Sequence, residues 1–224
     1  MELPAAKIGT SLTKKTKKDN GMGLSTRYVN APPCRDQPER FLKYEYAQDL
    51  ANEISIEKGC RFFVVINGTF IAGDFIEAII TKNNWHVKRM TVSTLSMSQG
   101  NVDSFGNLIH GNFVDKFDLV LSDVFHANER HKNGIIPYLY KELDTEKCDF
   151  QLSVARTHCK ITTIETHCGL KIVIHGSANL RSSDNIEQIQ IEENELLHDF
   201  NVETVDLIAD KYKTINKAVR LFKL

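Results

Sequence analysis

The sequence predicts an α/β fold, an α/β/α sandwich around a mixed, largely parallel sheet. Short apolar runs rich in β-branched and aromatic residues, typical of buried strands, alternate along the chain with longer segments whose apolar residues recur every three or four positions. Strands that alternate with helices pack as a sheet between helical layers. Neither an internal repeat nor a clear linker interrupts the pattern, so residues 37–224 are expected to form one domain.

The first predicted elements are a helix, a strand and a second helix. A helix is expected over about residues 37–54, because Pro38 suits a first helical turn and apolar residues follow at three- and four-residue spacing. Residues 60–66 form a short apolar run and are predicted to be a buried strand. A second helix is expected over residues 73–82.

The same alternation continues to the end of the chain. Further strands are predicted at residues 85–95, 117–121, 150–154, 170–174 and 186–191. Helices are predicted at residues 101–109 and 129–143, and a last helix carries the apolar residues between Leu197 and Val219.

Charge is distributed unevenly, although the formal net charge is −1. Residues 1–30 carry six basic residues against two acidic ones, and residues 1–36 lack periodicity, so they are expected to form a flexible basic arm. Two interpretations of this arm stay open: a solvated tail, or a segment that contacts nucleic-acid phosphates. The candidate contacts are Lys14, Lys15, Lys17 and Lys18.

Composition predicts a soluble, cytoplasmic protein. The hydrophobic share of 42% and the charged share of 25% are ordinary for globular domains. No run of 18 apolar residues occurs, so we expect no integral membrane association. The first residues contain no apolar core of a secretory signal. Five cysteines without framework spacing indicate reduced thiols.

The stretch that carries most chemical information begins at His158. On a strand, His158 and Lys160 would project from one face, because side chains alternate. Ser177 and Asn179 would share a face in the same way if the backbone stays extended through Gly176. An imidazole nucleophile, a fixed cation and two neutral hydrogen-bonding side chains are the groups that phosphoryl transfer requires.

The order H-x-K-x4-E, followed by G-S-x-N, resembles the HKD motif of the phospholipase D superfamily over about residues 153–190. The usual motif has Asp where this chain has Glu165, for which we expect a structural hydrogen bond or ion pair. About four extra residues precede Gly176, and they fall at residues 166–169, a predicted hairpin turn, where added length is tolerated.

The resemblance implies a phospholipase D-like sandwich and a metal-independent phosphodiesterase. One motif histidine attacks phosphorus to form a phosphohistidine, and a second protonates the leaving oxygen. His158 would be the nucleophile, while Lys160 and Asn179 would hold the non-bridging oxygens. Ser177 would hydrogen-bond the phosphate or its neighbours, and Glu187 would orient the motif histidine.

A single motif predicts a dimer. Neither His167 nor His175 is followed two residues later by Lys, so the chain holds one copy, and a two-fold homodimer would bring two copies of His158 into one composite site. The basic arm, the small size and the lack of a membrane segment favour a DNA endonuclease. The alternatives are a lipid phosphodiesterase and a catalytically idle module that binds phosphate or nucleic acid.

Three other features of the sequence predict no cofactor. Residues 67–73 sit where a phosphate loop would, but lack its glycine and Gly-Lys patterns. Six Cys and His residues crowd into 28 positions without zinc-site spacing, so no metal ligand is assigned, although zinc at this hairpin stays open. Residues 126–132 combine His, Glu, Arg and Lys after a strand, as either a binding cluster or a solvated helix start.

Overall fold

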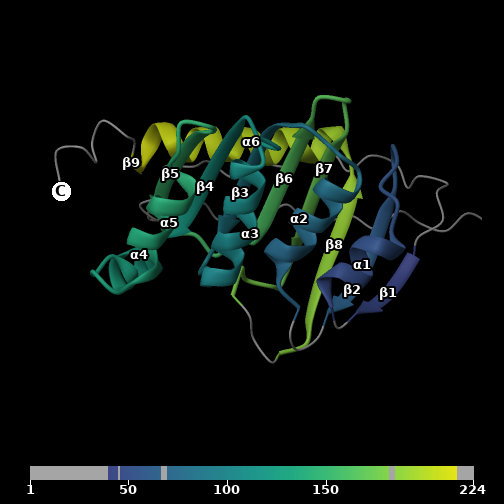
Figure 1. Ribbon diagram of the computed structural model, residues 1–224, viewed down its shortest axis with the longest axis horizontal. Helices are drawn as coiled ribbons and strands as arrows, with labels where there is room; N and C mark the ends of the chain where they lie inside the picture. Colours follow the sequence, from purple (N-terminus) through teal and green to yellow (C-terminus); the bar gives the residue numbers. More distant parts are fainter. Residues whose placement is uncertain (1–39, 45, 67–69, 182–184, 216–224) are drawn as a thin grey trace, which may run out of the picture.

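The computed structural model describes residues 40–44, 46–66, 70–181 and 185–215. The described residues form one nine-stranded sheet (Figure 1). Its strands are β1 (Arg40–Tyr44), β2 (Arg61–Ile66), β3 (Val87–Thr94), β4 (Lys116–Ser122), β5 (Asp149–Ala155), β6 (Ile161–Thr166), β7 (Lys171–Gly176), β8 (Glu187–Glu193) and β9 (Lys213–Ile215). They are ordered β1-β2-β8-β7-β6-β3-β4-β5-β9 across the sheet.

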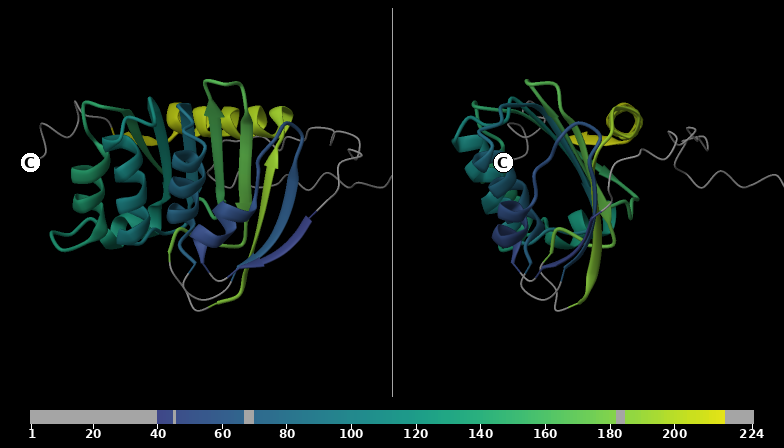
Figure 2. Two further views of the ribbon diagram at one scale, coloured as in Figure 1. Left: turned by 45° about the vertical axis from the view of Figure 1, so that its right-hand side comes forward. Right: turned by 90° about the vertical axis from the view of Figure 1, so that its right-hand side faces the viewer.

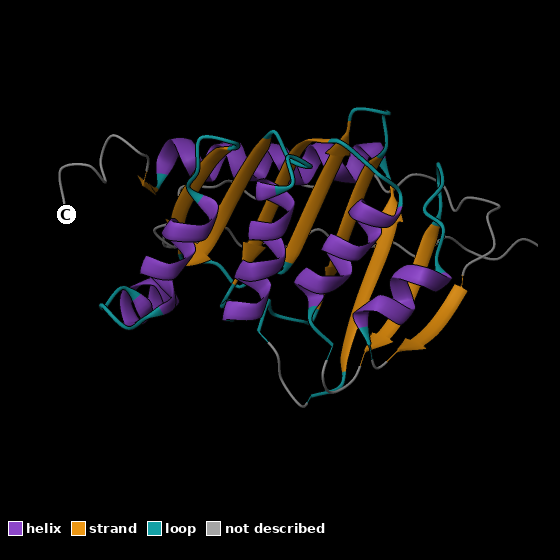
Figure 3. Ribbon diagram, in the orientation of Figure 1, coloured by secondary structure: helices purple, strands orange, loops and turns teal. Residues whose placement is uncertain are grey.

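Helices cover both faces of the sheet, as the sandwich prediction requires. They are α1 (Ala47–Glu53), α2 (Ala72–Lys82), α3 (Gln99–His110), α4 (Asp123–Glu129), α5 (Ile135–Leu143) and α6 (Glu195–Lys211). Helices α1, α2, α3 and α5 lie side by side on one face, and α6 crosses the opposite face over β7, β6, β3, β4 and β5 (Figures 2 and 3). None of the described helices has the length and apolar character needed to cross a membrane.

The sheet is mixed, but the prediction that it is largely parallel was wrong. Five of the eight strand pairs in the described sheet are antiparallel. The reason lies in β6, β7 and β8, which follow one another without an intervening helix. Strands joined by short connections pair antiparallel, whereas a parallel pair needs a crossover long enough to return to the same end. The alternation of strand and helix stops at β5, and the strands that follow pair antiparallel.

The prediction of a helix over residues 37–54 was wrong for residues 40–44 and is confirmed only for residues 47–53. Residues 40–44 form β1, which pairs parallel with β2, and only Ala47–Glu53 is helical. Pairing at the sheet edge has overridden the three- and four-residue spacing. The single helix predicted over residues 129–143 also differs from the structure, because α4 ends at Glu129 and α5 begins at Ile135.

The main core lies between the sheet and the layer of α1, α2, α3 and α5. At its centre the rings of Phe105, Phe117 and Phe150 contact in sequence, with centroids 5.2 and 5.8 Å apart. Aromatic pairs at this spacing add to the energy of apolar burial. A smaller cluster that includes Val205 and Ile208 packs α6 against the other face.

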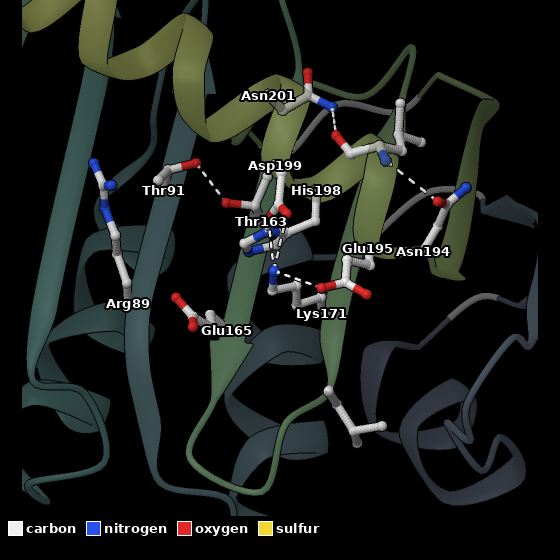
Figure 4. A network of polar contacts seen from close by, with 12 residues as sticks. Arg89, Thr91, Thr163, Glu165, Lys171, Asn194, Glu195, His198, Asp199 and Asn201 are labelled. Atoms are coloured by element: carbon white, nitrogen blue, oxygen red, sulfur yellow. Dashed lines mark hydrogen bonds and ion pairs between the residues drawn. The ribbon is translucent and has the colours of Figure 1, made fainter. Parts of the chain in front are cut away.

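Ion pairs also hold α6 against the sheet. The Lys171 ammonium on β7 contacts Asp199 at 2.9 Å and Glu195 at 3.1 Å (Figure 4). Arg89 on β3 reaches Asp206 at 2.5 Å in the same way. The acidic C-terminal stretch is therefore paired with cations of the sheet in these places. Helix α6 is positioned by charge as well as by apolar packing.

Candidate active site

The segments that carry the sequence motif meet at one end of four adjacent strands. Residues 158–160 immediately precede β6, Gly176 ends β7, and Glu187 begins β8. Since β8, β7, β6 and β3 are neighbours and successive pairs are antiparallel, the start of β6, the end of β7, the start of β8 and the end of β3 coincide. We call this edge of the sheet the motif end.

His158 and Lys160 lie in the loop before β6, not on a strand as predicted. Pairing with β7 begins only at Ile161, opposite His175. The side chain of His158 is exposed, and no hydrogen bond joins its imidazole to any described residue. The Lys160 ammonium donates to the carbonyl of His158 at 3.1 Å, and the Lys160 carbonyl accepts from the Gly176 N–H at 3.4 Å. Loop hydrogen bonds, not the pleat of a strand, therefore hold the backbone of this segment and the Lys160 ammonium in place.

Gly176 and Ser177 are held tightly against the start of β8. The Ser177 N–H donates to the Gln188 carbonyl at 2.9 Å, and the Gln188 N–H donates to the Ser177 hydroxyl at 3.0 Å. The Ser177 hydroxyl in turn donates to the carboxylate of Glu187. At Gly176 a Cβ atom would lie 2.0 Å from the Gln188 carbonyl oxygen. The glycine of G-S-x-N is therefore required by the close approach of two backbones.

Asn179 is anchored beside the end of β3. Its neighbour Leu180 donates its N–H to the hydroxyl of Thr94 at 3.3 Å and accepts from the Ser98 N–H at 2.7 Å. The Asn179 carboxamide oxygen is buried and has no hydrogen-bond partner among the described residues. A buried polar atom without a partner costs free energy, which marks the Asn179 amide as a candidate contact for a bound ligand.

The two acidic residues of the motif have different partners. Glu165 forms an ion pair with Lys88 at 2.8 Å, which confirms the structural role expected for it. Glu187 contacts Ser177, and in the described part of the chain no hydrogen bond joins it to His158. Its position fixes the serine, and the orientation of the histidine that sequence reasoning expected from it stays a prediction.

A buried carboxylate near the end of β8 that lies away from the motif was missed by sequence reasoning. Glu192 on β8 lies 3.3 Å from the His175 imidazole, 3.0 Å from the Arg61 guanidinium and 3.2 Å from the Asn194 amide. Burial alone raises its pKa, but these hydrogen bonds and the positive charge of Arg61 prevail and lower it to about 2. Arg61 lies 131 residues away in sequence, so no local pattern indicates the pair. The pair ties β2, β8 and β7 together.

Two hollows adjoin the motif. A small one of about 30 Å³ is lined by residues from both halves of the motif, including Lys160, Gly176 and Ala178. A larger one of about 280 Å³ lies between α6 and the sheet, lined in part by Ser93 and Cys159. Lys160, Gly176 and Ala178 therefore line the small hollow, whereas His158, Ser177 and Asn179 are not among its lining residues.

The remaining candidate residues divide into two groups. Lys14, Lys15, Lys17 and Lys18 lie outside the described residues. Residues 126–132 follow the end of β4, at the motif end but two strands from β6. There His126 is buried, whereas Arg130 and Lys132 are exposed, so a binding cluster and a solvated helix end both remain open.

Two exposed cations flank the motif in sequence, and the sequence reasoning above did not name them. Arg156 comes two residues before His158, and Arg181 comes two residues after Asn179. Both side chains are exposed. They bracket the motif with positive charge, which suits an anionic ligand.

Solved structures with a similar fold include a phospholipase D family member, Nuc from Salmonella typhimurium, at 13% identity over 58% of this chain and 83% of that chain, with a TM-score of 0.44. NucT from Helicobacter pylori is 13% identical over 57% of this chain and 82% of its own chain, with a TM-score of 0.43. Polyphosphate kinase from Porphyromonas gingivalis is 9% identical over 66% of this chain and 26% of its own chain, with a TM-score of 0.48. Neither a protein-family model nor a curated protein sequence matches. The similarity is one of fold, and one of these structures is described as a phospholipase D family member.

Proposed function

We propose that this protein is a metal-independent phosphodiesterase that cleaves DNA through a phosphohistidine on His158. One observation carries the proposal: the segments H-x-K and G-S-x-N, separated in sequence, meet at the motif end, where the Gly176 N–H donates to the Lys160 carbonyl at 3.4 Å. A nucleophilic imidazole, a cation and neutral hydrogen-bonding groups in one place suit in-line attack on a phosphodiester.

The reaction would proceed in two balanced steps. The His158 imidazole attacks phosphorus, a P–N bond forms, and the bond to the leaving oxygen breaks while a second histidine donates a proton to that oxygen. Water then attacks the phosphohistidine, its proton passes to the second histidine, and the P–N bond breaks to release a phosphate monoester. General acid catalysis of this kind contributes about 10²- to 10⁴-fold.

Lys160 and Asn179 would stabilise the charge that develops on the phosphate. The Lys160 ammonium needs only to leave the His158 carbonyl to reach a non-bridging oxygen. Rotation of the Asn179 amide exchanges its oxygen for its NH₂ group, which would place a donor at the position that now lacks a partner. Glu187 would hold the Ser177 hydroxyl in place at the motif end.

The decisive test compares His158→Ala with wild type on plasmid DNA, single-stranded DNA and phosphatidylcholine vesicles, with and without EDTA. We expect DNA cleavage that survives EDTA and falls at least ~10³-fold in His158→Ala, because the nucleophile is lost. His110→Ala, which removes another exposed histidine, should keep wild-type activity. Wild-type rates in His158→Ala, or complete inhibition by EDTA, would overturn the mechanism. Cleavage of the lipid alone would overturn the choice of substrate.

We also propose that the active species is a homodimer with one composite site. Each chain supplies one motif histidine, and two-fold symmetry would place two on opposite sides of the phosphorus. Light scattering should give about twice the chain mass of 25.5 kDa. An excess of His158→Ala chains, exchanged with wild type, should suppress activity beyond simple dilution. A fully active monomer would contradict this proposal.

Cations of the arm and beside the motif would hold the polyanion. If Lys14, Lys15, Lys17 and Lys18 contact phosphates, removal of residues 1–36 should weaken DNA binding and flatten its dependence on salt, because fewer counterions are released. Arg181→Gln should do the same to a smaller degree, since it removes one charge beside the motif. Fluorescence anisotropy across a salt series measures both. If the shortened chain binds DNA with unchanged affinity, the arm does not contact the phosphates and is a solvated tail.

A further inference from the structure

Two histidines and an aspartate meet at the end of the sheet opposite the motif. His86 immediately precedes β3, Asp115 immediately precedes β4, and His167 immediately follows β6. Since β3 is parallel to β4 and antiparallel to β6, the start of β3, the start of β4 and the end of β6 coincide. All three side chains are about half exposed.

The side-chain atoms of this cluster already converge. The His167 Nε2 lies 2.7 Å from Asp115 Oδ2, and the His86 Nδ1 lies 3.6 Å from Asp115 Oδ1. One ligand atom from each of the three residues lies within 4.8 Å of the others. Ligands of tetrahedral zinc stand about 2.0–2.2 Å from the ion, which separates any two of them by about 3.3–3.6 Å. Small rotations of exposed rings would satisfy this geometry.

The backbone beneath the cluster is fixed by a ladder of hydrogen bonds. The His167 N–H donates to the His86 carbonyl at 2.8 Å, and the Asp115 N–H donates to the Val87 carbonyl at 3.0 Å. The two imidazole rings meet edge to face, with centroids 5.3 Å apart. A binding group arranged before its ligand arrives loses less entropy when it binds.

We infer that His86, Asp115 and His167 bind a divalent transition-metal cation of the zinc class. Imidazole nitrogens with one carboxylate oxygen suit zinc, cobalt or nickel, whereas magnesium and calcium prefer all-oxygen sites. The bound ion would keep at least one position open to water and would link the segments that precede β3 and β4 to the β6–β7 turn. The cluster lies at the far end of the sheet from His158, so its ion takes no part in the proposed cleavage.

The sequence hides this site because its ligands come from three separate segments. The zinc alternative raised by the sequence rests on six Cys and His residues between Cys148 and His175, His167 and Cys168 among them. In the structure the Cys168 thiol instead contacts the Thr166 hydroxyl at 3.1 Å, and it is not among the converging ligand atoms. Short-spacing patterns cannot detect a site that depends on strand pairing.

Zinc titration by isothermal calorimetry tests the inference. We expect saturable binding of one ion per chain in wild type and at least tenfold weaker binding in His86→Ala, His167→Ala and Asp115→Asn. His110→Ala is the matched control, because His110 is also exposed and also faces a carboxylate, Glu142, at 3.7 Å. This variant and Cys168→Ser should bind as wild type does. Equal affinity in wild type and the three site variants, or loss of binding in His110→Ala, would overturn the inference.

A second measurement uses the unaltered protein and so does not depend on how a variant folds. Zinc should protect His86 and His167, but not His110, from modification by diethylpyrocarbonate, as read by peptide mass spectrometry. Modification of both cluster histidines at the same rate with and without zinc would contradict the site. DNA cleavage by His86→Ala should equal that of wild type, which separates this inference from the proposed function.

Discussion

Gly176 shows how a single methyl group can disrupt the motif. An added Cβ would lie 2.0 Å from the Gln188 carbonyl oxygen, and this oxygen belongs to the backbone, so it cannot rotate away. We expect Gly176→Ala to lower the free energy of unfolding by about 1–3 kcal/mol through overpacking, and to lower any phosphodiesterase activity as well. Urea denaturation measures the first effect. Gly100→Ala in α3, whose Cβ would have its nearest neighbour at 3.5 Å, should be neutral or slightly stabilising, and an equal loss in both variants would refute the steric argument.

Glu192 gives the protein a defined sensitivity to acid. Hydrogen bonds from His175, Asn194 and Arg61 outweigh burial and hold its pKa at about 2, below the ordinary 4.5. A depressed pKa contributes stability that is complete above pH 4.5 and is lost as the pH falls from 4.5 towards 2. The shift corresponds to stability on the order of 3 kcal/mol. Urea unfolding from pH 6 to pH 3 should show a steeper loss in wild type than in Glu192→Gln. Parallel pH profiles would contradict this role.

At the scale of the element, α6 carries a second pH dependence. His198 in its first turn is buried, its Nδ1 lies 2.9 Å from an Asp199 oxygen, and its Nε2 has no partner among the described residues. Burial lowers the pKa of His198 below 6.5, although the hydrogen bond to Asp199 opposes this shift. A folded-state pKa below the unfolded one means that stability is complete above pH 6.5 and falls as the pH drops below it. His198→Gln should lose this dependence near pH 6 while keeping the one at lower pH. Thermal unfolding across pH 5 to 8 measures it, and an unchanged pH profile would refute it.

The elements also show what sequence reasoning could reach. The strand at β2 and the turn between β6 and β7 were predicted, because apolar runs and turn residues are local signals. β1 and the antiparallel character of the sheet were not, since both depend on which strands become neighbours. The site divides in the same way. The motif residues were visible in sequence order, whereas the pairing of Arg61 with Glu192 and of Ser177 with Glu187 required the fold.

At the scale of the whole molecule, one sheet and one main core predict a single cooperative transition. The core extends from α1 to β5 without interruption. Phe105→Ala, at a fully buried position, should lower the free energy of unfolding by about 3–5 kcal/mol. Fluorescence of Trp85, the single tryptophan, and far-UV circular dichroism should report one midpoint in wild type and in the variant. Separate midpoints would show that the edge strands unfold independently of the rest.

The place of β8 in the sheet sets an order of assembly. β8 lies between β2 and β7, and its residues pair with partners up to about 130 positions earlier in the chain, such as Arg61 with Glu192. During synthesis, β3, β4 and β5 can pair as they emerge, but β1 and β2 can pair only with each other until β8 has left the ribosome. Closing so long a loop is slow, because chain entropy must be overcome before any contact forms. The segment from β1 to β2 is therefore made among the first and docks among the last, and its apolar strand stays open to chaperones throughout that delay.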